Sequence, residues 1–251
     1  MDIKHSRIKA KKLQEVKDVS VLRLRKPDED KEGLKWLTEV WKLKHLPPYI
    51  WIGDLRLRKE VIKETEKGFP EIREIEQDYL NPVLVLKTDQ VLYWRDINPS
   101  ISNKGWITSN QPVVIENSNS QNLYVVEGLT DYITLYQIDP EGSFLILGSV
   151  ANADKVISYL KEQEKKGVNI ILALDNDEAG ISTTKKIQRR LKTSINLSKA
   201  YKGFKDFAEF YLNADAEDLN KFREKLEKEI KEIRDKKQQR KKTSRGFGLS
   251  L

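Results

Sequence analysis

The sequence predicts an α/β domain with a mostly parallel sheet, preceded by a smaller α+β subdomain and followed by a charged helix and a basic tail. From Leu123 onward, short apolar runs alternate with segments of helical periodicity. This alternation is typical of repeated strand–helix units and of a parallel sheet. The first 120 residues lack it and are punctuated instead by proline and glycine.

Residues 1–120 are expected to form the α+β subdomain. A first helix is predicted by apolar residues at helical spacing, namely Trp36, Leu37, Val40 and Trp41. Residues 55–67 are expected to form a second amphipathic helix. Residues 83–95 are expected to form a hairpin that turns at Thr88-Asp89-Gln90. The polar stretch 116–121 has the composition of a linker, which places the domain boundary there.

Residues 121–213 are expected to form the α/β domain. The predicted strands cover residues 123–126, 144–147, 168–174 and, more weakly, 195–199. The predicted helices cover residues 129–137, 153–166 and 180–191. Each helix connects two neighbouring strands, so the crossovers should be right-handed.

Residues 214–240 are expected to form a charged helix, and residues 241–251 a flexible basic tail. The helix has one narrow apolar stripe, formed by Leu219, Phe222, Leu226, Ile230 and Ile233. The segment that follows, Lys-Lys-Gln-Gln-Arg-Lys-Lys-Thr-Ser-Arg, has six positive charges and no negative charge. Such a run favours a solvated, disordered segment.

The composition excludes several classes of protein. The chain of 251 residues has no cysteine, which excludes disulfides, thiolate zinc sites and cysteine nucleophiles and fits a reducing compartment. No run approaches the ~18 apolar residues that a membrane span requires. A cytoplasmic protein without membrane contact is therefore expected.

The positive charge is concentrated at the two ends of the chain. Residues 1–27 have nine basic and three acidic residues, and residues 221–251 have twelve and five, while the formal net charge of the whole chain is only +7. The middle of the chain is therefore acidic. Basic ends around an acidic middle favour a polyanionic partner such as nucleic acid, although lysine and arginine also simply solubilise exposed helices.

Three acidic segments contain the candidate site residues. Glu127 follows the strand at 123–126, Asp175 and Asp177 follow the strand at 168–174, and Asp131 and Asp206 lie in or near the segments downstream. Open α/β sheets bind ligands at the carboxyl ends of their strands. A carboxylate cluster without cysteine suits a hard cation such as Mg²⁺ or Mn²⁺.

Two of these segments resemble a known domain. Glu-Gly-x-x-Asp at 127–131, followed by Asp-Asn-Asp-Glu-Ala-Gly at 175–180, resembles the Toprim domain of topoisomerases, bacterial-type primases and some nucleases. The alternative is that these acids merely cap helices. The resemblance implies a Rossmann-like fold with a divalent metal site.

Finer features resemble the RNA-polymerase core of DnaG-like primases, as found in bacteria and phages. These features are Asp131 one turn into its helix, the glycine-containing loop at 147–153, and the segment Lys205-Asp206-Phe-Ala-Glu209-Phe. Primases have proline and aspartate where this chain has Phe207 and Ala208, which leaves one auxiliary metal contact open.

Upstream, residues 79–96 and 104–109 resemble the basic amino-terminal subdomain of the same core, which forms a groove with the Toprim domain. Arg95, Lys104 and Trp106 are therefore candidate nucleic-acid contacts. The alternative is that Trp106 packs in the core and Lys104 is a solvated surface group.

The resemblance assigns a role to each candidate residue. Asp175 and Asp177 would be metal ligands with Asp131 and Asp206 as secondary ligands, and Glu127 would hold metal or act as a general base. Gly128 and Gly180 would let the backbone approach phosphate. Lys205 would contact the nucleotide.

The leading hypothesis is a primase that uses a single-stranded DNA template and nucleoside triphosphates. The chain lacks the zinc ligands of a primase zinc domain and the Gly-x-x-x-x-Gly-Lys-Ser/Thr loop of a helicase, so a replicative helicase or template-recognition partner is expected. Two alternatives are a Toprim nuclease, resembling the OLD family or the ribosomal-RNA maturases, and a non-catalytic nucleic-acid-binding adaptor.

Overall fold

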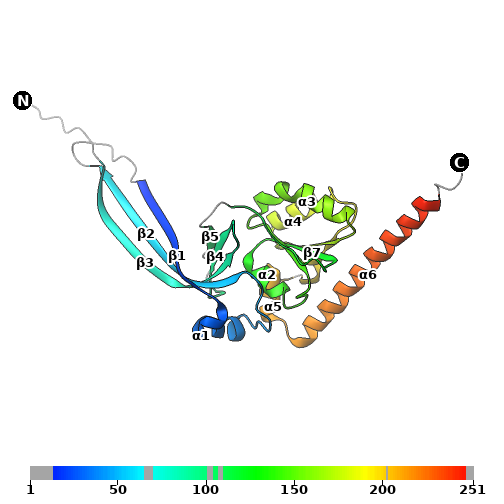
Figure 1. The fold of residues 1–251 in the computed structure, drawn as a ribbon, viewed down its shortest axis with the longest axis horizontal. Helices are drawn as coiled ribbons and strands as arrows, with labels where there is room; N and C mark the ends of the chain where they lie inside the picture. Colours follow the sequence, from blue (N-terminus) through cyan, green and yellow to red (C-terminus); the bar gives the residue numbers. More distant parts are fainter. Residues whose placement is uncertain (1–13, 65–69, 101–103, 107–109, 202, 247–251) are drawn as a thin grey trace, which may run out of the picture.

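The computed structural model describes residues 14–64, 70–100, 104–106, 110–201 and 203–246. Two five-stranded sheets organise these residues, one in each half of the chain (Figure 1). The predicted class is confirmed, because a mixed region precedes an α/β domain and a long helix follows it.

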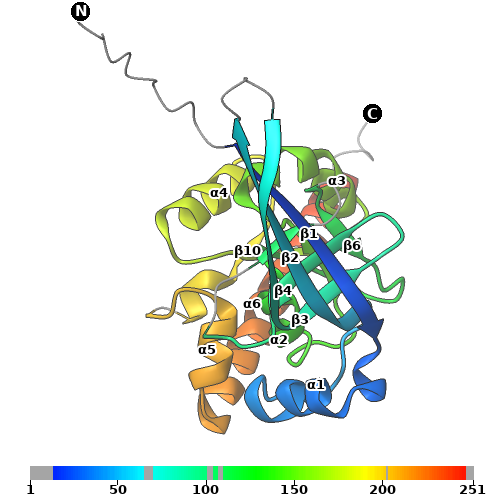
Figure 2. The ribbon, with the colours of Figure 1, turned by 90° about the vertical axis from the view of Figure 1, so that its left-hand side faces the viewer.

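The first sheet is antiparallel throughout, with strand order β1-β2-β3-β4-β5. Its strands are β1 (Gln14–Arg25), β2 (Ile50–Glu64), β3 (Pro70–Lys87), β4 (Leu92–Asp96) and β5 (Lys104–Trp106). The far parts of β1, β2 and β3 extend away from the rest of the molecule as a three-stranded arm (Figures 1 and 2). The hairpin predicted at 83–95 is present, with Val83 opposite Asp96.

The second helix predicted at residues 55–67 is wrong, because β2 covers residues 50–64 as a strand; residues 65–67 lie outside the described part. Leu55 and Leu57 also fit a period of two, and these residues pair with Val21 and Val19 of β1. Pairing with β3 on the other side completes the backbone hydrogen bonding of β2. Partners distant in sequence therefore decide between two periodicities that the short segment fits equally.

The helix predicted around Trp36 is confirmed in a modified form. A 3₁₀ turn (Pro27–Glu29) leads into α1 (Lys31–Lys35), which continues as a single π-helical turn (Trp36–Val40). The Asp30 carboxylate caps α1 by accepting a hydrogen bond from the Gly33 amide at 2.9 Å.

The second sheet is mostly parallel, with strand order β10-β9-β7-β8-β6. Its parallel strands are β7 (Asn122–Val126), β8 (Ser143–Ile146), β9 (Asn169–Ala173) and β10 (Ile195–Asn196), and β6 (Val113–Ile115) pairs antiparallel with β8. Its helices are α2 (Leu129–Leu135), α3 (Ala153–Lys165), α4 (Glu178–Gln188) and α5 (Phe207–Asn213). α3 and α4 pack on one face and α2 and α5 on the other, so both faces are buried.

Two boundaries of this domain differ from the expectation. The strand expected at 195–199 has only two residues and turns into a 3₁₀ helix (Leu197–Tyr201), because its one parallel neighbour, β9, pairs with it only at Ile195 and Asn196. β6 lies within residues 1–120 but belongs to the second sheet, since its partner is β8. The second sheet therefore starts before the expected linker at 116–121.

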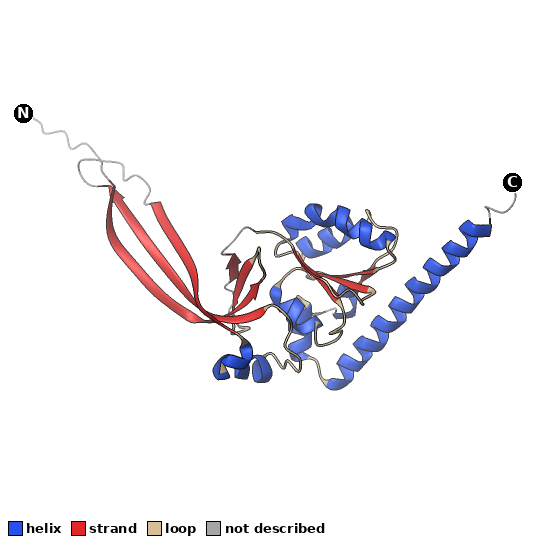
Figure 3. Ribbon diagram, in the orientation of Figure 1, coloured by secondary structure: helices blue, strands red, loops and turns tan. Residues whose placement is uncertain are grey.

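The long helix α6 (Ala216–Gly246) crosses the lower side of the second domain and ends beyond it (Figure 3). Phe222, Leu226 and Ile230 of the predicted stripe are buried. Residues 241–246, expected to belong to a flexible tail, continue the helix, while residues 247–251 lie outside the described part. None of the described helices is both long and apolar enough to span a membrane.

The two sheets share one core, which fixes the position of the first half relative to the second. Trp41 and Tyr93 belong to the same buried cluster as Tyr132 and Phe207. The Gln137 side chain reinforces this junction, because its carbonyl accepts from the amides of Lys44 and His45 and its amide donates to the His45 carbonyl. The facing surfaces of the two halves are therefore held together by packing and hydrogen bonds.

Candidate active site

Three carboxylates converge at the carboxyl-terminal edge of the second sheet. Asp131, Asp175 and Asp206 each place one oxygen within 4.8 Å of the other two. They come from α2, from the loop after β9, and from the start of α5. The sheet topology brings them together, because β7 and β9 are parallel neighbours whose carboxyl ends meet at one edge.

Asp131 is the most buried of the three, with 3% of its surface exposed. Its two carboxylate oxygens accept hydrogen bonds from the Gly128 and Ala208 amides, both at 3.3 Å. Burial, followed by the charges of Asp206 and Asp175, raises the pKa of Asp131 well above its usual range. The bond to Ala208 ties α2 directly to the segment that contains Asp206.

Asp175 lies two residues past the end of β9 and is also buried. Burial, then the charges of Glu127 and Asp206, raise its pKa to about 7, while Lys205 acts in the opposite direction. Asp131, Asp175 and Asp206 lie so close together that their carboxylates repel one another when all are ionised. A divalent cation would remove that repulsion, so the donor set fits Mg²⁺ or Mn²⁺.

Glu127 and Asp177 lie outside this group of three. Asp177 is exposed and caps α4, because its carboxylate accepts from the Gly180 amide at 2.8 Å. Glu127 is half-buried, and its backbone carbonyl accepts from the Gly148 amide at 2.8 Å. Burial raises the pKa of Glu127, the charge of Lys104 lowers it, and the charge of Asp177 raises it further. Glu127 is therefore close enough to both basic and acidic groups of the site for their charges to act on it.

Gly128 and Gly180 differ in why they lack a side chain. A Cβ at position 180 would collide with the backbone carbonyl of Asp175, so close packing of α4 on the Asp175 loop explains this glycine. A Cβ at position 128 would meet nothing closer than the Asp131 carboxylate, at 3.6 Å. A Cβ at position 128 would thus be in ordinary contact, so close packing does not explain this glycine.

The first sheet presents basic groups toward these acids. Arg95 on β4 pairs in register with Lys104 on β5. Lys104 is exposed, and its charge lowers the pKa of Glu127. Tyr93 lies on the same face of β4 as Arg95. Burial raises the pKa of Tyr93, the charge of Arg95 lowers it, and the charges of Asp131 and Glu127 raise it further. The guanidinium of Arg95 lies 6.0 Å from the Trp41 ring centroid, and its buried Nε has no hydrogen-bond partner among the described residues. Trp106 lies in β5, but its side chain is outside the described part.

Asn176 is a residue of this site that the sequence analysis missed. Its side-chain amide donates to the carbonyls of Ser198, Tyr201 and Phe204, at 3.3, 3.3 and 2.9 Å, and its backbone amide donates to the Lys205 carbonyl. Asn176 thereby holds the loop that leads to Asp206 against the loop that contains Asp175. Its place between two aspartates was the only signal in the sequence.

Lys205 and Glu209 complete the third acidic segment. Asp206 caps α5 by accepting from the Glu209 amide at 2.7 Å, and the Glu209 carboxylate accepts from the Lys205 amide at 2.6 Å. The Lys205 side chain is exposed, and its charge opposes the raised pKa of both Glu127 and Asp175. Phe207 and Ala208, where primases have proline and aspartate, are buried in the core.

Comparison with known proteins agrees with this geometry. Residues 124–211 match a family model described as Toprim-like, and these residues contain all five candidate acids. The Toprim resemblance predicted from the motifs is therefore confirmed for residues 124–211, which we refer to as the Toprim-like domain. No curated protein sequence matches the chain.

Two solved structures are similar to part of this chain. The primase fragment of the bacteriophage T7 primase-helicase protein is 18% identical, with a TM-score of 0.44, over 65% of this chain and 65% of that chain. The aligned part thus spans slightly less than two thirds of that structure. A second structure, of the bacteriophage T7 lagging-strand DNA polymerase with primase domains bound to an RNA/DNA hybrid and dTTP, is 21% identical, with a TM-score of 0.37, over 58% of this chain and 80% of that chain.

Proposed function

We propose that this protein is a primase-type nucleotidyltransferase, which synthesises short primers on a single-stranded DNA template from nucleoside triphosphates. The observation that carries the proposal is the convergence of Asp131, Asp175 and Asp206 at the strand ends of a Toprim-like domain. The proposal is also supported by the basic residues Arg95 and Lys104, which lie in register on a sheet that shares a buried core with that domain.

In this proposal, Asp131, Asp175 and Asp206 hold divalent metal, with Asp177 at the rim of the site. In the described parts of the chain, no lysine or arginine forms an ion pair with the first three carboxylates. Their oxygens therefore have no ion-pair partner with which a metal cation would have to compete. Mg²⁺ or Mn²⁺, when bound, supplies charge stabilisation for the attacking and leaving oxygens of phosphoryl transfer.

In this proposal, Glu127 acts as the general base and also lies near the metal ligands. Its half-buried carboxylate has a raised pKa, which favours proton acceptance from the 3′-hydroxyl of the growing strand. Lys104 and Lys205 are the cations that act on Glu127, and their exposed side chains are suited to hold the triphosphate. Gly128 would let the backbone approach a phosphate.

The template would lie between the two sheets, where the charge of Lys104 acts on Glu127 and Arg95 is in register with Lys104 on the neighbouring strand. Backbone phosphates pair with such cations without regard to sequence. The proposal places the protein in the cytoplasm, with a replicative helicase or a template-recognition protein as partner.

One experiment tests the proposal directly. The protein is incubated with single-stranded DNA, ribonucleotides, deoxyribonucleotides and Mg²⁺ or Mn²⁺, and the products are resolved on a denaturing gel. New oligonucleotides are expected from the wild type, and Asp175→Ala is expected to reduce them by at least about a hundredfold. Glu162→Ala is the matched control, because it removes an exposed carboxylate of α3 whose partner is Lys166 and should leave synthesis unchanged.

Other results would contradict the proposal. Metal-dependent shortening of the DNA, without new oligonucleotides, would show the nuclease alternative. Binding of DNA with neither product, under both metals, would show the non-catalytic adaptor.

A further inference from the structure

A second charged site lies at the opposite edge of the Toprim-like domain. It is a cavity of about 780 Å³ between the carboxyl-terminal ends of α3 and α4 and the outer half of α6. We refer to it as the basic cleft, after the six cationic side chains that line it: Lys161, Lys165, Arg190, Lys192, Arg234 and Lys237.

The charge of the basic cleft is not balanced from within. Glu164 is the one acid in its lining, and one carboxylate oxygen of Glu164 accepts from both the amide and the hydroxyl of Thr193. Lys161, Lys165, Arg190, Lys192 and Arg234 form no ion pair with another described residue. The cleft therefore has a net charge of +5 from its lining side chains.

Lys237 has a structural role at the floor of the cleft. Its Nζ donates to the Gly167 and Val168 carbonyls at 3.1 and 3.0 Å, and to the Asn169 side chain at 3.1 Å. These bonds fix α6 to the loop before β9. The shape of the basic cleft is therefore set by direct contacts between elements.

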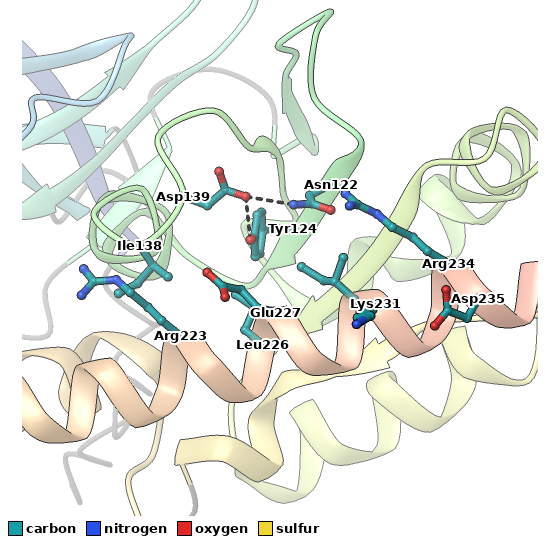
Figure 4. A pocket seen from close by; sticks show the side chains of 11 residues that line it. Asn122, Tyr124, Ile138, Asp139, Arg223, Leu226, Glu227, Lys231, Arg234 and Asp235 are labelled. Atoms are coloured by element: carbon teal, nitrogen blue, oxygen red, sulfur yellow. Dashed lines mark hydrogen bonds between the residues drawn. The ribbon is translucent and has the colours of Figure 1, made fainter.

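The excess of positive charge in the basic cleft is not a general property of the cavities along α6, because the neighbouring cavity has equal numbers of basic and acidic side chains. Figure 4 shows that cavity, of about 510 Å³, beside Asn122 and Tyr124, whose side chains both donate to Asp139. Its three cations are matched by three acids: Arg223, Lys231 and Arg234 against Asp139, Glu227 and Asp235. Helix carboxyl ends attract cations within their last turn, which accounts for Lys165 but not for Lys161 or Arg234.

The position of the basic cleft suits an extended polyanion. Gln121 and Gly167 line the cleft: Gln121 directly precedes β7, and Gly167 lies two residues before β9. Glu127 and Asp175 follow the other ends of these strands. Strands of five residues separate the two edges by about 16 Å. A strand of several nucleotides spans that distance, so it can place phosphates in the cleft while another part of it lies at the acids.

We propose that the basic cleft binds the phosphate backbone of a nucleic-acid strand outside the active site. The cations of the basic cleft come from α3, from the loop after α4 and from α6, so the positive charge is spread over several elements rather than focused on one point. Charge spread in this way fits the successive phosphates of a strand better than a single compact phosphate. The identity of the strand as single-stranded DNA rests on the proposed function, but binding at the cleft does not require catalysis.

The test measures binding of a fluorescein-labelled single-stranded oligonucleotide by anisotropy over a range of salt concentrations. The variant Lys165→Gln/Arg190→Gln/Lys192→Gln removes three cleft charges and leaves the Lys237 bonds intact. Loss of three phosphate contacts should reduce the salt slope by about 2 and the affinity by roughly tenfold to a hundredfold at 0.1 M salt. The matched control Lys26→Gln/Lys31→Gln/Lys44→Gln has the same charge change at exposed positions of the first half and should keep the wild-type slope.

Each outcome separates the cleft from the catalytic proposal. If the cleft variant keeps the wild-type salt slope while the wild type synthesises oligonucleotides, the basic cleft is not a nucleic-acid site and the proposed function stands. If the slope falls while no variant or wild type makes product, the cleft is supported and the proposed function fails. If a free triphosphate displaces the labelled oligonucleotide but unlabelled DNA and RNA do not, the cleft does not bind a strand. If unlabelled strands displace it, the stronger competitor of DNA and RNA identifies the kind of strand.

Discussion

At the scale of the residue, the charge state of Asp175 controls the candidate site. Its carboxylate is buried two residues past β9, and burial together with Glu127 and Asp206 raises its pKa to about 7. A carboxyl whose pKa is higher in the folded than in the unfolded protein stabilises the fold when protonated. That stabilisation is complete below the unfolded pKa and is lost as the pH rises through about 7.

The free energy of unfolding of the metal-free protein should therefore fall by an amount on the order of a few kcal/mol as the pH rises from 5.5 to 8. The melting temperature should fall with it. Asp175→Asn should flatten this dependence, because it removes the titrating group. Added Mg²⁺ should raise the melting temperature more at pH 8 than at pH 5.5, since protons compete for the same oxygens. Thermal melts in EDTA and in Mg²⁺ measure both effects, and a stability that increases from pH 6 to 8 in EDTA would contradict them.

Asn176 acts at the same scale, but through position rather than charge. Its side-chain amide donates hydrogen bonds to the backbone carbonyls of Ser198, Tyr201 and Phe204, in the segment that leads to Asp206. Without that amide, partly buried carbonyls lose their donor and the loop is freed from Asp175. The consequence should appear in stability and in metal affinity together.

Asn176→Ala is expected to lower the free energy of unfolding by about 1–3 kcal/mol and to weaken Mg²⁺ binding by about tenfold or more. Urea denaturation and calorimetric titration with Mg²⁺ give the two numbers. Asn213→Ala is the control, because the Asn213 side chain is exposed and donates to a single carbonyl, that of Glu209. Equal metal affinity in the wild type and Asn176→Ala would show that the loop keeps its place without this residue.

At the scale of the element, α6 supports the helix that presents Asp206. Phe222 packs against Phe207 and Phe210 of α5, with ring centroids 5.0 and 5.5 Å apart. α5 begins at the Asp206 cap. The long charged helix is thus part of the scaffold of the acidic site, although it contributes no ligand to it.

Phe222→Ala should destabilise the protein by about 3–5 kcal/mol, since it empties a buried aromatic site. Because α5 loses its support, Mg²⁺ affinity should fall as well, even at temperatures where the variant stays folded by circular dichroism. Leu219→Ala, a half-buried position one turn earlier on α6, should cost less and leave metal binding intact. A Phe222→Ala protein with wild-type Mg²⁺ affinity would separate α6 from the site.

At the scale of the whole molecule, basic and acidic surfaces face each other across the junction of the two halves. Lys104 belongs to the first sheet, yet its charge acts on Glu127 of the second domain. The shared core around Trp41 and Tyr132 keeps these surfaces in place. Under the proposed function, this junction is where the template phosphates bind.

Lys104→Gln is expected to reduce the salt slope of oligonucleotide binding by about 0.7, the value for one phosphate contact on a single strand. It should also raise the pKa of Glu127 further, because Lys104 is the largest influence that lowers it. The pH profile of oligonucleotide synthesis would then move to higher pH. Lys31→Gln, exposed on α1, should change neither measurement, and an unchanged slope with Lys104→Gln would remove Lys104 from the template path.

Local patterns were sufficient to predict an α/β domain with acids at the ends of its strands, and the resemblance of two motifs added the Toprim assignment. Apolar runs at 123–126 and 168–174 mark buried strands, and the acids that follow them mark the ligand edge of the sheet. These signals depend on periodicity and on neighbours in the chain. They are readable without knowledge of which segments pair.

Only the tertiary structure decided which groups meet. It brought Asp131 and Asp206 to Asp175, used Asn176 to hold two loops together, and made residues 50–64 a strand rather than a helix. It also gathered the basic cleft from α3, α6 and the loops beside them. Each of these features joins residues that are distant in the chain, and a periodic pattern contains no information about such pairings, because the same local sequence is compatible with several partners.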